Sequence, residues 1–440
     1  MQAFALFIYR LLTKALQPLI RLRLARRAKK EPLYGQWIEE RFGHYVQAQT
    51  QAPSSGWVWI HAVSLGETRA AAILLNALRA EMPGMKLLLT NGTATGRAEG
   101  AKLLLSGDIQ VWQPWDSASA TRNFIAHFKP RIGIVMETEV WPNLCAAARD
   151  ARVPMVLANA RLNEKSASKA LRFAWLARPA YGSFAQVLAQ TQSDAERLRA
   201  VGGARVQVLG NVKYDLSLQD DLMARGLQFK ATLGQKKVIL LASSREGEEA
   251  LFLEQIRHFA GIESAQGAIE SIANARDAQI QWMIVPRHPQ RFDEVERLCE
   301  QAGLSVSRRS HWLGLPQAAD IWLGDSMGEM PMYYALADIA LLGGSFEPLG
   351  GQNLIEAIAT GCPILMGPHT FNFAEACDTA QAMQAAVRCT DMANAVVQAA
   401  RIVQSPHEMQ QLQSSGRAWL AQSRGAALRM AQAISAELKS

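Results

Sequence analysis

The chain has 440 residues, which is long enough for two domains that each bury a hydrophobic core. Apolar residues make up 49% of it and charged residues 19%, so a largely disordered protein is excluded. The net charge of +7 indicates an anionic partner, which could be a nucleic acid, a membrane surface or a phosphorylated substrate.

Residues 1–23 form an apolar segment that Arg10 and Lys14 interrupt before it reaches the roughly 20 residues needed to cross a bilayer. Read as a helix, its polar residues form one stripe and its apolar residues fill the remainder, which is typical of a helix lying in the membrane interface. Pro18 is expected to kink this helix, and the basic run at residues 21–30 would attract anionic head groups. We favour membrane association; the alternative is an amphipathic helix packed on its own protein.

Between residues 57 and 214, short apolar runs alternate with helical patterns, and the same rhythm restarts at residue 237. The predicted strands are WVWIHAV, KLLLT, IGIVME, PMVLANA, VLAQT and VQVLGN in the first half, then KVILLAS, QWMIVPR, ADIWLGD, ADIALLGG and CPILMGP. Such alternation predicts two α/β domains with parallel sheets, joined near residues 216–235, with a cleft between them. No G-x-G-x-x-G motif follows the first strand of either half, which weighs against a dinucleotide-dependent enzyme.

Carboxylates follow the predicted strands of the first half. Glu67 comes at the start of a helix, where it could be a general base or merely a carboxylate that favours the helix dipole. Glu137 and Glu139 end the strand IGIV and would point to the same side if the strand continued, as a functional pair or as members of a buried salt bridge. Lys213 stands near Asp215, and the simplest interpretation is a solvated ion pair.

Anion-binding groups follow the strands of the second half. Ser243, Ser244 and Arg245 precede a helix that begins with two glutamates, and Arg287 and His288 end another strand, where an arginine could grip a phosphate. The segment GDSMGEMP is expected near the same edge of the sheet.

The stretch at residues 338–368 predicts a strand, a glycine-rich turn, a helix that begins at Asn353 and a second strand. Clustered glycines at the end of a strand let backbone N–H groups approach a phosphate, and the helix dipole adds positive charge. The alternative for Asn353 and Glu356 is an ordinary capping box. Carboxylates in one half and anion-binding groups in the other suit a transferase with a hydroxyl acceptor and an activated, phosphorylated donor.

Five cysteines are scattered without a C-x-x-C pair or a zinc-site spacing. We therefore expect reduced thiols, no disulfide and no structural metal.

Eight motifs occur in order over nearly the whole chain: HAVSLGE, METEVWPN, ANARL, GNVKYD, VPRHPQRF, GDSMGEMP, GGQNLIEA and MGPHTFNF. Together they resemble the bacterial 3-deoxy-D-manno-octulosonic acid (Kdo) transferases. The resemblance implies a GT-B fold, in which two Rossmann-like α/β domains have parallel sheets facing a central cleft. It implies a membrane-associated helix and basic run at 1–35, an acceptor domain at 36–220, a CMP-sugar donor domain at 221–415, and a C-terminal helix at 416–440 that returns to the first domain.

The same resemblance implies an inverting, metal-independent transfer of Kdo from CMP-Kdo to a lipid A precursor (lipid IVA, a tetraacylated glucosamine disaccharide bisphosphate) in lipopolysaccharide synthesis. The expected partners are therefore CMP-Kdo, this lipid and a membrane surface with anionic lipids, with no nucleic acid and no cofactor apart from the donor. The expected location is the cytoplasmic face of the inner membrane, through peripheral or monotopic attachment by the N-terminal helix.

Carried over residue by residue, the resemblance makes Glu67 the catalytic base and assigns Glu137 and Lys213 to stabilisation of the transition state. The residues that match the family's CMP-binding segments are Pro286, Arg287, Met327, Gly328, Glu329, Asn353, Leu354, Ile355 and Glu356. The chain departs from the usual pattern at Ser244 and Arg245, where many members have Thr-His, and at Gln352 and Leu354, where many have His and Pro. A GT-B enzyme for a UDP-sugar and a non-catalytic nucleotide- or lipid-binding protein are the two alternatives.

Overall fold

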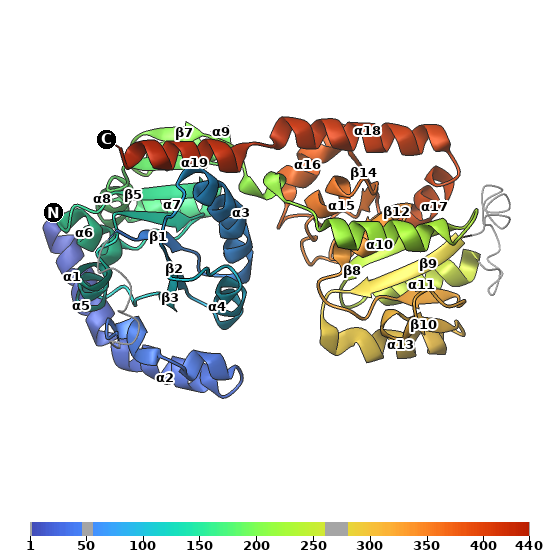
Figure 1. The fold of residues 1–440 in the computed structure, drawn as a ribbon, viewed down its shortest axis with the longest axis horizontal. Helices are drawn as coiled ribbons and strands as arrows, with labels where there is room; N and C mark the ends of the chain where they lie inside the picture. The colour runs from blue at the N-terminus through green and yellow to red at the C-terminus, as the bar shows by residue number, and fades with distance from the viewer. Residues whose placement is uncertain (1, 46–55, 260–279, 440) are drawn as a thin grey trace. The chain divides into compact units, whose positions relative to one another are not determined.

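The computed structural model describes residues 2–45, 56–259 and 280–439. The chain divides into two compact units: unit 1 contains Met1–Asp215 and Ser423–Ser440, and unit 2 contains Leu216–Gln422. Among the described residues, each unit has one parallel sheet of seven strands with helices on both faces (Figure 1). The predicted class, α/β with two Rossmann-like domains, is confirmed.

The sheet of unit 1 has the strand order β3-β2-β1-β4-β5-β6-β7. Its strands are β1 Val58–His61, β2 Leu87–Asn91, β3 Ile109–Trp112, β4 Ile132–Met136, β5 Met155–Ala160, β6 Gln186–Ala189 and β7 Val206–Val208. Its α-helices are α1 Gln2–Ala15, α2 Gln17–Ala28, α3 Leu65–Glu81, α4 Ala94–Ala101, α5 Ala118–Phe128, α6 Pro142–Asp150, α7 Glu164–Arg172, α8 Ala174–Tyr181, α9 Gln192–Ala200 and α19 Ala426–Glu437; the short 3₁₀ turns are η1 Pro32–Gly35, η2 Ile38–Phe42 and η4 Val212–Asp215. The strand order reverses between β1 and β4, and open α/β sheets bind ligands outside the carboxyl ends of strands at such a switch point.

The sheet of unit 2 has the order β10-β11-β9-β8-β12-β13-β14, so its switch point lies between β8 and β12. Its strands are β8 Lys237–Ser244, β9 Ile280–Pro286, β10 Val306–Arg308, β11 Ile321–Leu323, β12 Ile339–Leu342, β13 Ile364–Met366 and β14 Ala386–Arg388. Its helices are α10 Asp220–Ala231, α11 Glu248–Phe259, α13 Phe292–Gln301, α14 Met330–Leu336, α15 Ile355–Ala359, α16 Ala374–Ala382, α17 Met392–Ile402 and α18 Pro406–Ser423, with 3₁₀ turns η5 Pro289–Arg291 and η6 Arg309–His311.

The core of unit 1 covers both faces of its sheet because successive residues of a strand point to opposite sides. Trp59 packs on one face with Phe124 of α5. Its neighbours Val58 and Ile60 pack on the other face in a cluster that includes Met430 of α19. Since both faces are buried, the parallel strands read as continuous apolar runs rather than as alternating patterns.

The boundaries between the units differ from the sequence prediction. They fall after residues 215 and 422 rather than after 220 and 415. The carboxylate of Asp215 accepts hydrogen bonds from the backbone N–H groups of Gly425 and Ala427, which ties η4 to the start of α19 within unit 1. Helix α18 continues past residue 415 and belongs to unit 2, where the buried Trp419 donates a hydrogen bond to Thr379.

The N-terminal segment forms two helices, with a break at Leu16 and Pro18 in the first turn of α2. The polar stripe of this segment faces the rest of unit 1. Tyr9 donates a hydrogen bond to Asp116 (2.8 Å), and Arg10 and Gln17 donate to Asn143 and Ser117 (3.3 and 3.2 Å).

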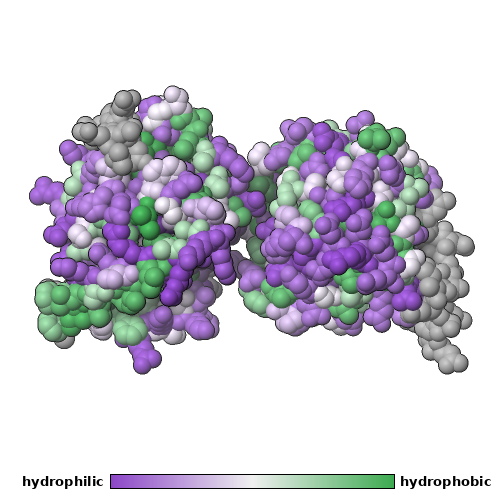
Figure 2. All heavy atoms as spheres, turned by 90° about the horizontal axis from the view of Figure 1, so that it is seen from below, coloured by the Kyte–Doolittle hydropathy of each residue, from purple (hydrophilic) through white to green (hydrophobic). Residues whose placement is uncertain are grey.

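Most of the large apolar side chains of the same segment are exposed instead, although Leu24 is buried. The exposed ones are Phe4, Phe7, Ile8, Leu11, Leu12, Leu16, Leu19 and Leu22, with Phe4 68% exposed. Figure 2 shows an apolar band on unit 1. An amphipathic helix packed on its own protein would bury its apolar face and expose its polar face, whereas this segment does the opposite.

None of the helices in the described part of the chain is both long and apolar enough to cross a bilayer.

Candidate active site

The turn from β1 into α3 positions Glu67. Ser64 caps the helix: its hydroxyl accepts a hydrogen bond from the backbone N–H of Glu67 (3.3 Å) and lies 3.0 Å from the Glu67 carboxylate, to which it donates. The backbone N–H of Val63 donates to the other carboxylate oxygen (2.8 Å). Glu67 therefore stabilises the start of helix α3, which agrees with the alternative interpretation of this residue as a carboxylate that favours the helix dipole. Its electrostatic surroundings distinguish it from an ordinary capping carboxylate.

Burial raises the pKa of Glu67 to about 7. The neighbouring charges of Glu139 and Glu137 raise this pKa further, and the hydrogen bonds from Val63 and Ser64 offset part of the shift. A carboxyl group with a pKa near the working pH is well suited to accept a proton from a substrate and to release it afterwards.

Glu137 directly follows β4 in a left-handed backbone conformation (φ 55°). The strand therefore ends at Met136, so the condition under which Glu137 and Glu139 would point to the same side is not met. The buried Glu137 carboxylate forms ion pairs with Lys213 (Nζ to Oε1, 3.0 Å) and Arg161 (Nε to Oε2, 2.8 Å). A strained backbone conformation persists only where the surrounding structure holds the residue in place. The two ion pairs hold Glu137 in this way.

Lys213 and Asp215 do not form the solvated pair that the sequence suggested. Lys213 binds Glu137, and Asp215 instead accepts backbone N–H groups at the start of α19. The switch point between β1 and β4 consequently brings together the three residues predicted to be catalytic: Glu67 from α3, Glu137 after β4 and Lys213 from η4.

Sequence reasoning assigned no role to two polar residues of this cluster. Arg161 directly follows β5 and binds Glu137. Asn159 lies within an irregularity of β5 with φ 52°, and its side-chain oxygen accepts a hydrogen bond from the backbone N–H of Val212 (3.1 Å). Its buried amide nitrogen has no hydrogen-bond partner within the described part of the chain. The signal that could have found both is their position at the end of the strand beside β4.

In unit 2, the three predicted CMP-binding segments follow the strands β9, β11 and β12. Pro286 ends β9, and the backbone N–H of Arg287 donates to Ser244 at the end of β8 (3.0 Å). The charges of Arg287 and Glu356 both act on the pKa of the buried Tyr334, which desolvation raises well above its usual value. The first and third segments therefore both lie near Tyr334.

The second segment presents a loop held by ion pairs. Met327 is 58% exposed, and Gly328 has a left-handed backbone (φ 84°). Glu329 is bound by Arg309 (3.1 Å) and Arg225 (3.5 Å). Glu329 therefore braces the loop, while Met327 and Gly328 remain exposed.

The glycine-rich turn after β12 already binds a carboxylate of the protein itself. Glu248 accepts hydrogen bonds from the backbone N–H groups of Gly344 (2.7 Å), Phe346 (3.0 Å) and Arg245 (2.9 Å). The sequence analysis expected the start of α11 to bind an anion, and in the structure this helix start supplies one to the turn, the carboxylate of Glu248. Its other glutamate, Glu249, is likewise engaged, by Arg291 and Ser244.

The helix after the glycine-rich turn starts later than predicted. Helix α15 begins at Ile355 with Leu354 rather than Asn353 at its N-cap, and the side-chain oxygen of Asn353 accepts the Ile355 N–H (3.1 Å). Leu354 is fully buried. Helix α15 has only five residues, so its dipole adds less charge than the sequence analysis assumed.

The sequence analysis also predicted reduced thiols, no disulfide and no structural metal. All five cysteines are buried and free. In residues 2–45, 56–259 and 280–439, no group of three or more His, Cys, Asp or Glu side chains is arranged to hold a metal ion.

Comparison with known families gives one consistent result. The family model described as 3-deoxy-D-manno-octulosonic-acid transferase (kdotransferase) matches residues 36–216. The chain is 43% identical to the 3-deoxy-D-manno-octulosonic acid transferase of Bordetella pertussis, over 97% of this chain and 98% of that protein. It is 30% identical to the enzyme of the same name from Haemophilus influenzae, over 96% of each.

Solved structures show a likeness in fold alone. A glycosyltransferase from Rickettsia africae is 12% identical and has a TM-score of 0.53, covering 88% of this chain and 99% of that one. This neighbour has the GT-B fold, which agrees with the two Rossmann-like sheets described above.

Proposed function

Because the chain belongs to the family of Kdo transferases, which are glycosyltransferases, we propose that it transfers Kdo from CMP-Kdo to a lipid A precursor, the tetraacylated glucosamine disaccharide bisphosphate. The observation that carries this proposal is the position of Glu67. It is a half-buried carboxyl group with a pKa of about 7 at the switch point of the first sheet, beside the ion pairs of the buried Glu137. Family membership supplies the reaction, and this geometry supplies a base to perform it.

In the proposed mechanism, the Glu67 carboxylate accepts the proton of the acceptor hydroxyl as that oxygen attacks the anomeric carbon of Kdo. A new carbon–oxygen bond forms while the bond from the anomeric carbon to the CMP phosphate breaks, and CMP leaves from the opposite face. A single displacement of this kind inverts the anomeric configuration. It needs one base and no covalent enzyme intermediate, which is why we assign only Glu67 to proton transfer.

The ion-pair cluster beside Glu67 has a different part in the mechanism. Lys213 and Arg161 both form ion pairs with the single carboxylate of Glu137, which holds two cations beside Glu67. We assign to Lys213 the attraction of negative charge in the reacting sugar, either the carboxylate of Kdo or the charge that develops as CMP departs. Glu137 fixes the position of Lys213.

The donor phosphate would be bound in unit 2. Two N–H groups of the glycine-rich turn are already bonded to Glu248, so we assign the phosphate chiefly to Arg287, whose guanidinium can form two parallel hydrogen bonds with it. The exposed loop at Met327 and Gly328 and the segment from Asn353 to Glu356 would hold the remainder of CMP. A fixed guanidinium neutralises charge on the leaving group, which supports a reaction without a metal ion.

The rate of transfer is expected to depend on one ionisation near pH 7. Because burial raises the pKa of Glu67, protonation removes the active carboxylate as the pH falls below about 7. We expect kcat/KM to fall about tenfold per pH unit below that point and to level off above it. Rates measured from pH 5 to 9 check this, with CMP binding followed over the same range as a control. An acid limb near pH 4.5, the ordinary range of glutamate, would contradict the assignment.

The nucleotide of the donor is expected to be CMP. CMP should raise the unfolding temperature of the protein in proportion to its binding, whereas UDP at the same concentration should not. Arg287→Ala should abolish most of the stabilisation by CMP, and Arg297→Ala, which removes an exposed arginine from α13, serves as the matched control. A larger stabilisation by UDP than by CMP would instead favour a UDP-sugar enzyme of the same fold.

A further inference from the structure

Unit 1 contains a cavity of about 350 Å³ between helix α2 and the loops that follow β1, β2, β3 and β4. Its lining includes the cations Arg23, Arg27 and Arg41 and one carboxylate, that of Asp116. All of these residues belong to unit 1.

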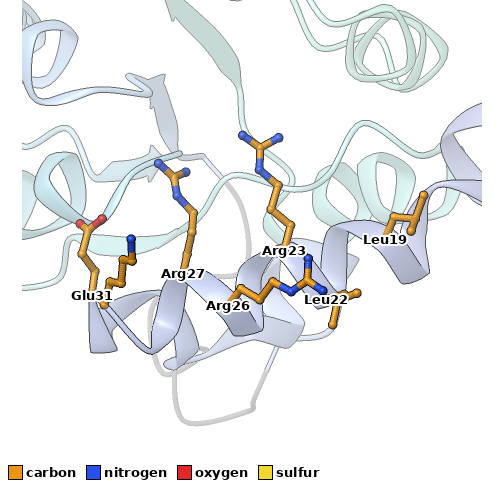
Figure 3. A pocket seen from close by; sticks show the side chains of 7 residues that line it. Leu19, Leu22, Arg23, Arg26, Arg27 and Glu31 are labelled. Atoms are coloured by element: carbon orange, nitrogen blue, oxygen red, sulfur yellow. The ribbon is translucent and has the colours of Figure 1, made fainter.

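Two of the three arginines can reach a ligand directly. Figure 3 shows a neighbouring pocket on α2 that is also lined by these two arginines. In that view Arg23 and Arg27, one turn apart on α2, extend from the same face of the helix, whereas Arg26 runs along the helix toward Leu22. Both are exposed, and Arg27 lies over the ring of Tyr34 at 4.8 Å.

The third arginine is built into the wall of the cavity. Arg41 is only 8% exposed and lies 4.0 Å over the ring of Trp112, and one of its terminal nitrogens donates to the carbonyl of Gly92 (2.9 Å). Its Nε is buried and has no hydrogen-bond partner in the described part of the chain. A buried donor without a partner is costly, and an oxygen of a bound anion would satisfy it.

The single carboxylate of the lining does not neutralise these cations. The oxygens of Asp116 accept hydrogen bonds from the backbone N–H groups of Asn143 and Leu144 and from the hydroxyl of Tyr9. The cavity therefore keeps an excess of positive charge that is not paired within its own wall.

The cavity adjoins the candidate base. Val63 lines it, and the backbone N–H of the same residue donates to the Glu67 carboxylate (2.8 Å). Trp141 also lines it and donates to Glu139, whose charge contributes to the raised pKa of Glu67. A ligand held in the cavity would consequently present its neighbouring groups to Glu67. Helix α2 also carries the exposed Leu19 and Leu22, next to which acyl chains could lie.

We propose that this cavity is a phosphate subsite for the lipid acceptor, in which Arg23, Arg27 and Arg41 bind a phosphate of the disaccharide headgroup and so place its hydroxyl at Glu67. The inference rests on the proposed function, because it names the part of the acceptor that the enzyme recognises. The phosphate headgroup of a bulk phospholipid has the same chemistry, and the experiment separates the two sources.

The test compares the double variant Arg23→Gln, Arg27→Gln with the control Arg26→Gln, Lys30→Gln, which removes two charges from the same helix and its end. With the bisphosphorylated acceptor, the first variant should lose about 10- to 100-fold in kcat/KM, as expected for charge-assisted hydrogen bonds to a phosphate, and the control should stay within about twofold of wild type. With an acceptor that lacks phosphates, the two variants should become equal. Equal losses with the phosphorylated acceptor would overturn the proposal, because the arginines would then act only as general surface charge.

Two further measurements distinguish the possible outcomes. Binding of the deacylated glucosamine disaccharide bisphosphate, followed by calorimetry, does not require turnover. If wild type binds it and the Arg23, Arg27 variant does not, the subsite stands even if Kdo transfer fails.

The second measurement is partition onto phosphatidylglycerol vesicles, which should fall equally in the Arg23, Arg27 variant and in the Arg26, Lys30 control. A larger fall for the Arg23, Arg27 variant, without a change in disaccharide binding, would assign the cavity to bulk lipid and contradict the proposal.

Discussion

Glu67→Gln is expected to lower kcat by about 10²- to 10⁴-fold, the range that a positioned general base contributes. Glutamine has the same shape and can still accept the hydrogen bond from the backbone N–H of Val63, so the start of α3 should remain intact. The loss should therefore appear in turnover, with the unfolding temperature and CMP binding close to those of wild type. Glu81→Gln, at the other end of the same helix, is the matched control and should leave the rate unchanged.

A second substitution makes this test sharper. The charge of Glu139 contributes to the raised pKa of Glu67. Glu139→Gln removes that negative charge, so Glu67 should lose its proton more easily and the acid limb of the rate profile should move to lower pH. If Glu67→Gln keeps a rate within about tenfold of wild type, or if the limb does not move in Glu139→Gln, Glu67 is not the base.

Replacing Phe7 and Leu11 with glutamate is expected to reduce partition onto lipid vesicles by at least about a hundredfold, because each large apolar side chain gains roughly 1.5–3 kcal/mol when it leaves water. Both side chains are more than half exposed (55% and 52%), so the change should not disturb the core. The physical reason for expecting a membrane here is the orientation of α1. Its polar residues already bind unit 1, which leaves the apolar face without a protein partner among the described residues.

The control for this prediction uses exposed apolar residues elsewhere in unit 1. Leu105 and Leu428 are 61% and 52% exposed, and their replacement by glutamate should leave partition unchanged. Vesicles of phosphatidylethanolamine with phosphatidylglycerol provide the surface, and co-sedimentation provides the measurement. Partition of the Phe7, Leu11 variant equal to that of wild type would place the membrane contact outside α1.

The central strands of both sheets could be predicted from sequence because they are buried on both faces. The strands that the sequence analysis missed are β3, β10 and β14, and each lies at an edge of its sheet. They have only three or four residues and are partly exposed. Short edge strands carry no continuous apolar run, so periodicity alone does not find them.

The candidate site was predictable in its positions but not in its contacts. Glu67, Glu137 and Lys213 each follow a strand or stand near its end, and the sheet order then brings them together. The hydrogen bond from the Gly344 N–H to Glu248 joins residues that are 96 positions apart. Nothing in the sequence around either residue indicates this contact. The outward apolar face of α1 agrees with the interpretation that the sequence favoured. The helical pattern alone could not exclude the alternative, because it separates two faces without saying which one meets the protein.

The most direct test of the account is to incubate wild type and Glu67→Gln with CMP-Kdo and the tetraacylated disaccharide bisphosphate, with and without a metal chelator in the transfer step, and to weigh the lipid by mass spectrometry. We predict that wild type adds one or more Kdo units in the presence and absence of the chelator, and that Glu67→Gln leaves the lipid almost unmodified. An unmodified lipid with wild type, while CMP still binds, would contradict the proposed transfer. Full modification by Glu67→Gln would contradict the proposed base.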